Sequence, residues 1–173
     1  MAKATVQWLE ASVWKKAQQS LPICCVDILP VMRGADGTVE AVGLIYRDTP
    51  HEGRRWCLVG GRLFRDESFA EAITRQIHHT LGVGMKFELA KDLRPAHVAQ
   101  YFTEKQDGLL HDPRQHAVSI IFAVAMEGIA EPCGEALDFR WYKLGELAEC
   151  SFGFGQGKVV AECLRADSGF IAP

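Results

Sequence analysis

The residues with the clearest chemical potential lie in one segment, residues 60–83, which reads GGRLFRDESFAEAITRQIHHTLGV. Two glycines open this segment, and glycine lets a backbone turn tightly and approach a ligand closely. Arg62 follows the glycines directly, and Arg75 lies farther along the segment. A guanidinium group is a planar fork that can bind two phosphate oxygens at once. The segment therefore favours binding of a phosphorylated ligand beside a glycine turn.

A helix is predicted to hold Arg75 in place. Ser68 and Glu71 form a capping box, in which each side chain satisfies a backbone N–H at the start of the helix. Gly82 is typical of a helix end. The helix has one apolar stripe, made by Phe69, Ile73 and Ile77. This stripe predicts that the helix packs on a core and presents its polar face to a ligand.

The remaining elements are mostly strands. The spacing of Val6, Leu9, Val13 and Ala17 predicts an amphipathic helix within residues 1–20. Strands are expected at 23–32, 39–47, 56–59, 85–90, 96–102, 117–126 and 138–143, and a helix at 156–166. A polar loop at 103–116 interrupts the strands. We expect one domain over residues 1–173, with an α/β or α+β sandwich fold and residues 1–20 as a helical extension.

The segment 60–83 resembles the Nudix box, in which a glycine, a glutamate and an Arg-Glu helix motif recur at fixed spacing. The matching positions are Gly61, Glu67, Arg75, Ile77, Gly82 and Val83. The pair Arg140 and Trp141, followed by Gly-Glu-Leu at 145–147, also fits this family. The resemblance implies an α/β/α sandwich with a mixed sheet, a central Nudix helix and a C-terminal helix. It also implies that Glu67 shapes the loop before the helix.

The resemblance further implies a divalent metal, Mg²⁺ or Mn²⁺, which the family holds with carboxylates on one helix face. In this chain Gln76, His79 and Thr80 replace the three family glutamates, so that face carries no carboxylate. Magnesium prefers anionic oxygen ligands, so the helix alone cannot supply its site. The candidate ligands that remain are Gly61, through its backbone, and Glu135. His79 could bind a softer ion, or could simply be solvated.

Within this family the chain is similar to the GDP-mannose mannosyl hydrolases, over about residues 20–145. Enzymes of that branch attack the sugar carbon and release GDP. The positions that match their nucleotide contacts are Asp27, Arg47, Arg62 and Arg75, beside Gly60 and Gly61. The resemblance implies that Asp27 recognises the base and that the arginines bind the diphosphate. Contacts that strengthen as the leaving group gains charge would contribute to catalysis, which makes Arg62 and Arg75 catalytic candidates.

The general base of that branch is missing from its position. The histidine of the family falls on Ala136, and its last box glutamate falls on Thr80. The neighbouring Glu135 could serve as metal ligand or as base, though hardly as both. His116, just before the strand at 117–126, is a second candidate base, because a histidine titrates near neutral pH. Other acid–base candidates in the long loop are Glu104, Asp107, His111 and Asp112.

Each charged residue also has a structural interpretation. Arg75 could pair with Glu71 one helical turn away, and Arg47 and Arg62 could be solvated loop charges. Asp27 lies in an otherwise apolar strand, where an unpaired carboxylate is costly. We therefore expect Asp27 to face a cleft or a hydrogen-bond donor.

Two functions follow as hypotheses. The first is a divalent-metal-dependent hydrolase of a nucleoside diphosphate linked to a sugar or a similar moiety. The alternative is a catalytically degenerate Nudix-fold protein that binds a nucleotide sugar, or acts as a regulator, without turning the ligand over. In both cases the partner is a small molecule. Neither the base, the sugar nor the attacked atom can be derived from the sequence.

The composition excludes other classes of partner. With 19 basic and 22 acidic side chains, the chain has a net charge of -3 and lacks the clustered positive charge that nucleic-acid binding needs. No apolar run reaches the roughly 18–20 residues of a membrane helix, and we expect a cytoplasmic protein with six reduced, mostly buried cysteines. Cys24 and Cys25 should point to opposite faces of a strand. The N-terminal helix, with Trp8 and Trp14, could pack on its own domain or on a second subunit, and a homodimer is a further expectation.

Overall fold

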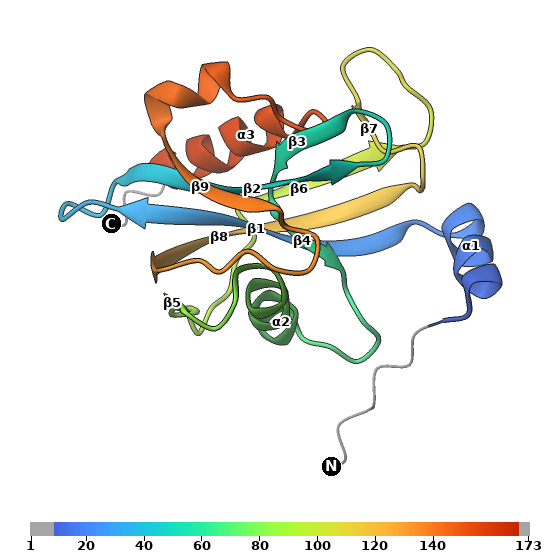
Figure 1. Ribbon diagram of the computed structural model, residues 1–173, viewed down its shortest axis with the longest axis horizontal. Coiled ribbons are helices and arrows are strands. Elements are labelled where there is room, and N and C mark those ends of the chain that lie inside the picture. Colours follow the sequence, from blue (N-terminus) through green and yellow to red (C-terminus); the bar gives the residue numbers. More distant parts are fainter. Residues whose placement is uncertain (1–8, 170–173) are drawn as a thin grey trace.

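The structure is a computed structural model that describes residues 9–169 (Figure 1). Its elements in chain order are α1 (Ala11–Ser20), β1 (Ile23–Arg33), β2 (Val39–Thr49), β3 (Gly53–Cys57), β4 (Val59–Arg62), α2 (Phe69–Leu81), β5 (Met85–Phe87), β6 (His97–Phe102), β7 (Leu110–His111), β8 (Ala117–Gly128), β9 (Asp138–Lys143), the 3-10 helix η1 (Leu144–Glu149) and α3 (Gln156–Gly169). The predicted α/β class is confirmed.

The strands form one mixed sheet around β1. The main strand order is β3-β2-β1-β8-β6-β7, while β4 pairs with β1, β5 with β8 and β9 with β2. The β1–β8 pair is parallel, and β1 pairs with β2 and β4 in the antiparallel sense. Because β1 is covered on both faces, most of it is apolar and buried. Asp27 interrupts this apolar run where β1 pairs with Gly60 of β4 and Ile121 of β8.

Two helices cover opposite sides of the sheet, α2 on one and α3 on the other (Figure 1). The predicted capping box of Ser68 and Glu71 is present, and the C-cap Gly82 has φ 76°. The apolar stripe of α2 is buried at Ile73 and Ile77, whereas Phe69 stays partly exposed. The polar face of α2 is thereby turned towards β4, which carries the two glycines.

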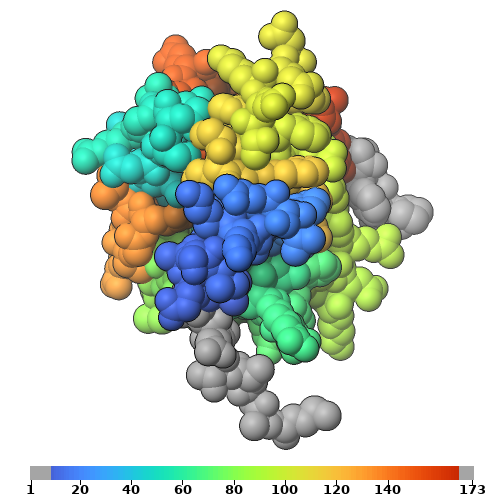
Figure 2. All heavy atoms as spheres, turned by 90° about the vertical axis from the view of Figure 1, so that its right-hand side faces the viewer, coloured from blue at the N-terminus to red at the C-terminus, as the bar shows by residue number. Residues whose placement is uncertain are grey.

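The N-terminal helix is shorter than expected, because α1 begins at Ala11, and the predicted Val6 and Trp8 lie outside the described residues. None of its residues is buried. The helix lies across the face that Figure 2 shows, where it is coloured blue. Trp14 is the residue of α1 that packs on the core. The first of the two expected placements, packing on its own domain, is therefore observed for Trp14.

Several strands differ in their bounds from the predictions, and one strand was not predicted. The strand expected at 56–59 is divided at Leu58, whose N–H donates to Gln156 Oε1 at 2.9 Å instead of joining a ladder. The strand expected at 85–90 ends at Phe87, where β5 leaves its pairing with β8. The long loop contains β7, which pairs with β6.

The cysteines are all free thiols, as predicted. Cys24 is exposed and Cys25 is buried, in agreement with their opposite orientations on β1. Cys133 is exposed as well, so the expectation of mostly buried thiols holds for Cys25, Cys57 and Cys163. None of the helices in the described part of the chain has the length and apolar character needed to cross a membrane.

Candidate functional site

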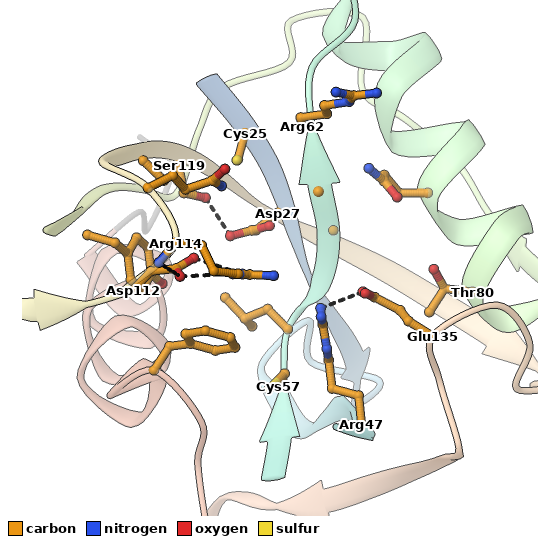
Figure 3. Close-up of a pocket in the computed structure, with 18 of the residues that line it drawn as sticks. Cys25, Asp27, Arg47, Cys57, Arg62, Thr80, Asp112, Arg114, Ser119 and Glu135 are labelled. Carbon is orange, nitrogen blue, oxygen red and sulfur yellow. Dashed lines mark hydrogen bonds and ion pairs between the residues drawn. The ribbon is translucent and has the colours of Figure 1, made fainter. Parts of the chain in front are cut away.

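A pocket of about 780 Å³ opens beside β4, between α1, α2 and the loops that precede β8 and β9 (Figure 3). It brings together nearly all the residues that the sequence singled out. Those that line it are Asp27, Arg47, Gly60, Gly61, Arg62, Arg75, His79 and Glu135. Residues from far-apart segments therefore share one hollow, with positive and negative side chains facing each other.

The two glycines are required by close contacts from both sides. A Cβ at Gly60 would overlap Asp27 Oδ1 and would lie 2.6 Å from Val26 O. A Cβ at Gly61 would lie 2.8 Å from the side-chain amide of Gln76 on α2. Contacts under about 3 Å are much shorter than the separation at which carbon atoms attract. The glycines thus let β4 pass between the carboxyl group of β1 and the amide of α2. They lie within strand β4 and not in the tight turn expected for them, because both pair with β1.

Asp27 lies at the floor of the pocket, where Ser119 of β8 donates a hydrogen bond of 2.6 Å to Oδ2. Burial raises the pKa of Asp27 to about 6, and nearby Glu135 raises it as well, while the Ser119 bond and Arg47 oppose this rise. The expectation that this carboxylate faces a cleft and a donor is confirmed. Asp27 is ionised for the most part at neutral pH, yet it is basic enough to accept a proton.

Arg75 is held by the loop before its own helix. Its Nε and Nη2 lie 2.5 and 2.7 Å from the two carboxylate oxygens of Glu67, and Nη2 also donates to Arg62 O at 3.1 Å. Its guanidinium lies 4.0 Å from the ring centroid of Phe64. Glu67 accepts a further bond from Phe64 N, so the loop-shaping role expected for Glu67 agrees with its contacts.

These contacts also decide the charge state of Glu67. Burial alone would raise the pKa of Glu67, but the bonds from Arg75 and from Phe64 N lower it below its ordinary value. The pair is partly buried, with side-chain exposures of 20% for Arg75 and 11% for Glu67. Most of the hydrogen-bonding capacity of Arg75 is therefore used inside the protein.

Arg62 lies between two aromatic rings. Its guanidinium carbon is 4.4 Å from the centroid of Trp14 on α1 and 5.3 Å from that of Phe64. Such a cation–π arrangement orients the guanidinium group. Burial lowers the pKa of Arg62, and the positive charge of Arg75 lowers it further. Arg62 thus adds positive charge to the part of the pocket next to α1.

Arg47 and Glu135 form an ion pair across the pocket, with Nη1 2.6 Å from Oε1 (Figure 3). Arg47 projects from β2, and Glu135 projects from the loop before β9. Burial raises the pKa of Glu135, while Arg47 and Arg114 lower it in part. Glu135 is therefore engaged by a guanidinium, which competes with its expected roles as metal ligand and as base.

Arg114 is a pocket residue that the sequence did not reveal. It follows β7 in the long loop and binds the buried Asp112 through Nε at 2.9 Å and Nη2 at 2.7 Å. Its side chain keeps 43% of its exposure and extends into the pocket (Figure 3). The segment HDPRQH has no recognisable motif. An arginine placed by a turn of this kind cannot be found by spacing, although Asp112 was among the loop candidates.

His116 does not line this pocket, so its proposed role as general base needs correction. Its ring stacks on Phe102 at 5.1 Å, and it borders a separate hollow next to α1. Within the described residues, His116 Nε2 is buried without a hydrogen-bond partner. The loop residues Glu104 and Asp107 are exposed and away from the pocket lining. His111 instead packs edge-on against His51 at 4.8 Å.

Comparison with known protein families assigns the chain to one of them. A family profile described as a domain of unknown function, DUF4916, matches residues 4–165. The chain belongs to the DUF4916 family. No match was found among curated proteins.

Solved structures show which fold this DUF4916 chain shares. A possible asymmetric diadenosine tetraphosphate (Ap4A) hydrolase from Jonesia denitrificans is 27% identical, with a TM-score of 0.73 over 89% of this chain and 99% of the other. The NUDIX domain of Shewanella oneidensis NrtR, solved with ADP ribose, is 15% identical, with a TM-score of 0.62 over 91% and 97%. The chain therefore has a Nudix fold.

A third solved structure of this fold carries a metal. It is a bifunctional NMN adenylyltransferase/ADP ribose pyrophosphatase from Francisella tularensis, complexed with AMP and a manganese ion. It is 18% identical, with a TM-score of 0.60 over 88% of this chain and 45% of the other. That likeness raises the question whether the DUF4916 pocket can hold a cation.

The expected cation site of Gly61, Glu135 and His79 does not fit the DUF4916 chain. All three residues line the pocket, but Glu135 is bound to Arg47 and Gly61 is covered by Gln76. His79 is exposed. Across residues 9–169, no three side chains of the His, Cys, Asp or Glu type are grouped so that they could hold a metal ion. The carboxylates that line the pocket are bound to Arg47, Arg114 and Ser119, and they are not grouped around a common point for a cation.

Proposed function

We propose that this pocket binds a nucleoside diphosphate linked to a sugar or similar group and hydrolyses that link. The observation that carries the proposal is that Arg47, Arg62 and Arg114 line the same pocket as Asp27, beside the glycines of β4. Planar guanidinium forks match the oxygens of a diphosphate in pairs. The chain has the Nudix fold, which supports the same class of ligand.

Asp27 is the proposed general base. In hydrolysis, water bonds to the attacked carbon or phosphorus atom and passes a proton to the base, while the diphosphate or phosphate product leaves with the electron pair. A carboxylate with its pKa raised to about 6 combines ionisation at neutral pH with useful basicity. The arginines then stabilise the charge that grows on the leaving oxygen. The role expected for Asp27 from the resemblance, recognition of the base, is the alternative use of the same carboxylate.

GDP-mannose is the first substrate that we propose, because the positions of Asp27, Arg47 and Arg62 match those of the mannosyl hydrolase branch. ADP-ribose and Ap4A come next, since a solved neighbour holds the former and another is described as a possible hydrolase of the latter. GDP-mannose differs from the other two in its base, Ap4A differs from the other two in its number of phosphates, and each of the three has a different linked group. A panel built on them therefore reports which feature the pocket selects.

Recognition without turnover is the second candidate function. It is favoured by Gln76 and Thr80, which are buried at 8% and 3% exposure on the helix face where the family has glutamates. A protein of this kind would bind the same ligands and release them unchanged. Binding and catalysis therefore have to be measured separately.

The decisive experiment combines product detection with calorimetry. The purified chain is incubated at high concentration with each of the three nucleotides, with Mg²⁺, with Mn²⁺ and with EDTA, and the products are separated by chromatography. Product formation from at least one nucleotide is expected. Calorimetric binding without product in any condition would favour the second candidate, and neither binding nor product would disprove the proposal.

We also propose that residues 1–173 form one domain and that the chain is a homodimer. The single mixed sheet over residues 9–169 supports the first statement. Light scattering coupled to gel filtration tests the second, with a mass near twice 19.2 kDa expected for the dimer.

A further inference from the structure

We infer that the pocket binds the phosphates of its ligand with guanidinium groups in place of a divalent cation, so that ligand binding by this chain does not depend on metal. The inference rests on the proposed function for the class of ligand, a diphosphate. It goes beyond that function because it assigns the positive charge to Arg47 and Arg114. It also departs from the metal requirement that the Nudix resemblance implies.

The first argument concerns the space between α2 and β4. With the Gln76 amide oriented to satisfy its neighbours, its oxygen lies 3.1 Å from Gly61 N and 3.1 Å from Arg75 Nη1. The amide thus joins the helix to the glycine backbone through Gly61 N, and it also accepts a hydrogen bond from the guanidinium group of Arg75. Thr80, one turn later, is buried and uncharged. A hard cation prefers anionic oxygens, and this face of α2 provides none.

The second argument concerns the carboxylates that remain. Each one near the pocket already has a donor. The pairs are Glu67 with Arg75, Glu135 with Arg47, Asp112 with Arg114, and Asp27 with Ser119. A cation that bound Glu135 Oε1 or the oxygens of Asp112 would displace a guanidinium group from them. Breaking a partly buried pair in this way leaves an uncompensated charge, which is costly.

The third argument is that positive charge is already in place. Four arginines and three carboxylates line the pocket. The side chain of Arg47 is 17% exposed to solvent, and that of Arg114 is 43% exposed. Within the described residues, Arg47 Nη2 and Arg114 Nη1 take no part in a hydrogen bond. These donors remain for a ligand, and Figure 3 shows both side chains extending towards β4.

The arrangement has a clear chemical logic. A guanidinium is a permanent cation and binds two phosphate oxygens with fixed geometry, so it needs no metal to neutralise them. The carboxylates that hold Arg47 and Arg114 orient these forks before the ligand arrives. Such preorganisation lowers the cost of binding. The pocket would therefore accept inorganic pyrophosphate by itself, as well as a nucleoside diphosphate.

The inference is tested by calorimetry with inorganic pyrophosphate and ADP-ribose, in EDTA and in Mg²⁺. Dissociation constants that agree within about threefold are expected, and Arg114→Met should weaken binding by about tenfold or more, equal to about 1.4 kcal/mol. Arg54→Met is the matched control, since Arg54 is an exposed arginine outside the pocket, paired with Asp48. Arg47→Gln is a second variant, in case loss of the Asp112 partner unfolds the first.

Manganese alone provides an independent measurement. Electron paramagnetic resonance titration of the free chain with Mn²⁺ should detect no saturable site at micromolar concentration. Saturable binding that Glu135→Gln removes would overturn the inference, as would binding of pyrophosphate that requires metal.

The outcomes separate the inference from the proposed function. Metal-free binding of pyrophosphate without hydrolysis of any nucleotide would support the inference and reject the hydrolase. Hydrolysis that requires Mg²⁺ for ligand binding would support the hydrolase and reject the inference. Absence of phosphate binding in every condition would reject both.

Discussion

The two sides of the pocket use the same residue type in different ways. On the side of α2, Arg75 gives its guanidinium to Glu67, to a backbone carbonyl and to the ring of Phe64. On the opposite side, Arg47 and Arg114 each bind one carboxylate and keep donors that face the pocket. Arg75 falls on a motif position and Arg114 falls on none. A match to a motif therefore does not establish that a residue contacts the ligand.

The largest effect is expected from Asp27→Asn. This variant tests whether the reaction takes place on the side of the pocket where Arg47 and Arg114 keep donors for a ligand. Loss of a general base should lower kcat by about 10²–10⁴-fold, while Asp107→Asn on the exposed loop serves as a control with unchanged activity. Steady-state rates with the best substrate of the panel are the measurement. An Asp27→Asn variant with undiminished kcat would assign Asp27 to recognition of the base.

The pH dependence of activity is the next largest effect. Asp27 must be ionised to act as a base, and its pKa is raised to about 6. Plotted as log kcat/KM, activity should fall by about tenfold for each pH unit below 6. The Asp27→Asn variant should not show this fall in log kcat/KM below pH 6.

The stability of the protein should change with pH in the opposite direction to its activity. The raised pKa of Asp27 favours the protonated carboxyl group in the folded state. The contribution of Asp27 to stability is thus present below about pH 4 and lost as pH rises through 6. Denaturation of the wild type and of Asp27→Asn at both ends of this range provides the check. A constant difference between the two proteins would contradict the assignment.

Glu67→Gln tests the structural role of the Arg75–Glu67 pair on the α2 side of the pocket. It leaves the partly buried Arg75 without its anionic partner, and we expect a loss of about 1–3 kcal/mol in the free energy of unfolding. Urea denaturation measures the loss, with Glu104→Gln on the exposed loop as the control. A loss below about 0.5 kcal/mol would place Glu67 among ordinary surface ion pairs.

Arg62→Ala is expected to have the smallest effect on the fold, because Arg62 is only partly buried and its contacts with Trp14 and Phe64 are cation–π contacts. Nucleotide affinity should fall by about tenfold, or about 1.4 kcal/mol, with little change in unfolding. Calorimetry and thermal melting together give both quantities. An unchanged affinity would remove Arg62 from the site.

The sequence predicted those parts of the molecule that local chemistry determines. The capping box of Ser68 and the apolar run of β1 depend on neighbouring residues or on a fixed spacing. The placement of Asp27 followed from the cost of an unpaired carboxylate in an apolar strand. These inferences needed no knowledge of contacts between distant segments.

The remainder depends on contacts between residues far apart in the chain. The division of the strand at Leu58 results from Gln156, which belongs to the last helix. The ion pair of Glu135 with Arg47 joins the loop before β9 to strand β2. The ring of His116 stacks on Phe102, outside the lining of the pocket. None of these pairings leaves a periodic signal in the sequence.

The placement of α1 has a practical consequence for handling the protein. Trp14 and Gln18 form one wall of the pocket, yet no residue of the helix is buried, and the side chain of Gln18 donates a hydrogen bond to the side chain of Gln115 in the domain. Trimming or fusing the amino terminus would therefore reshape ligand selectivity while sparing the core. Assays are best performed with a purification tag at the other end of the chain.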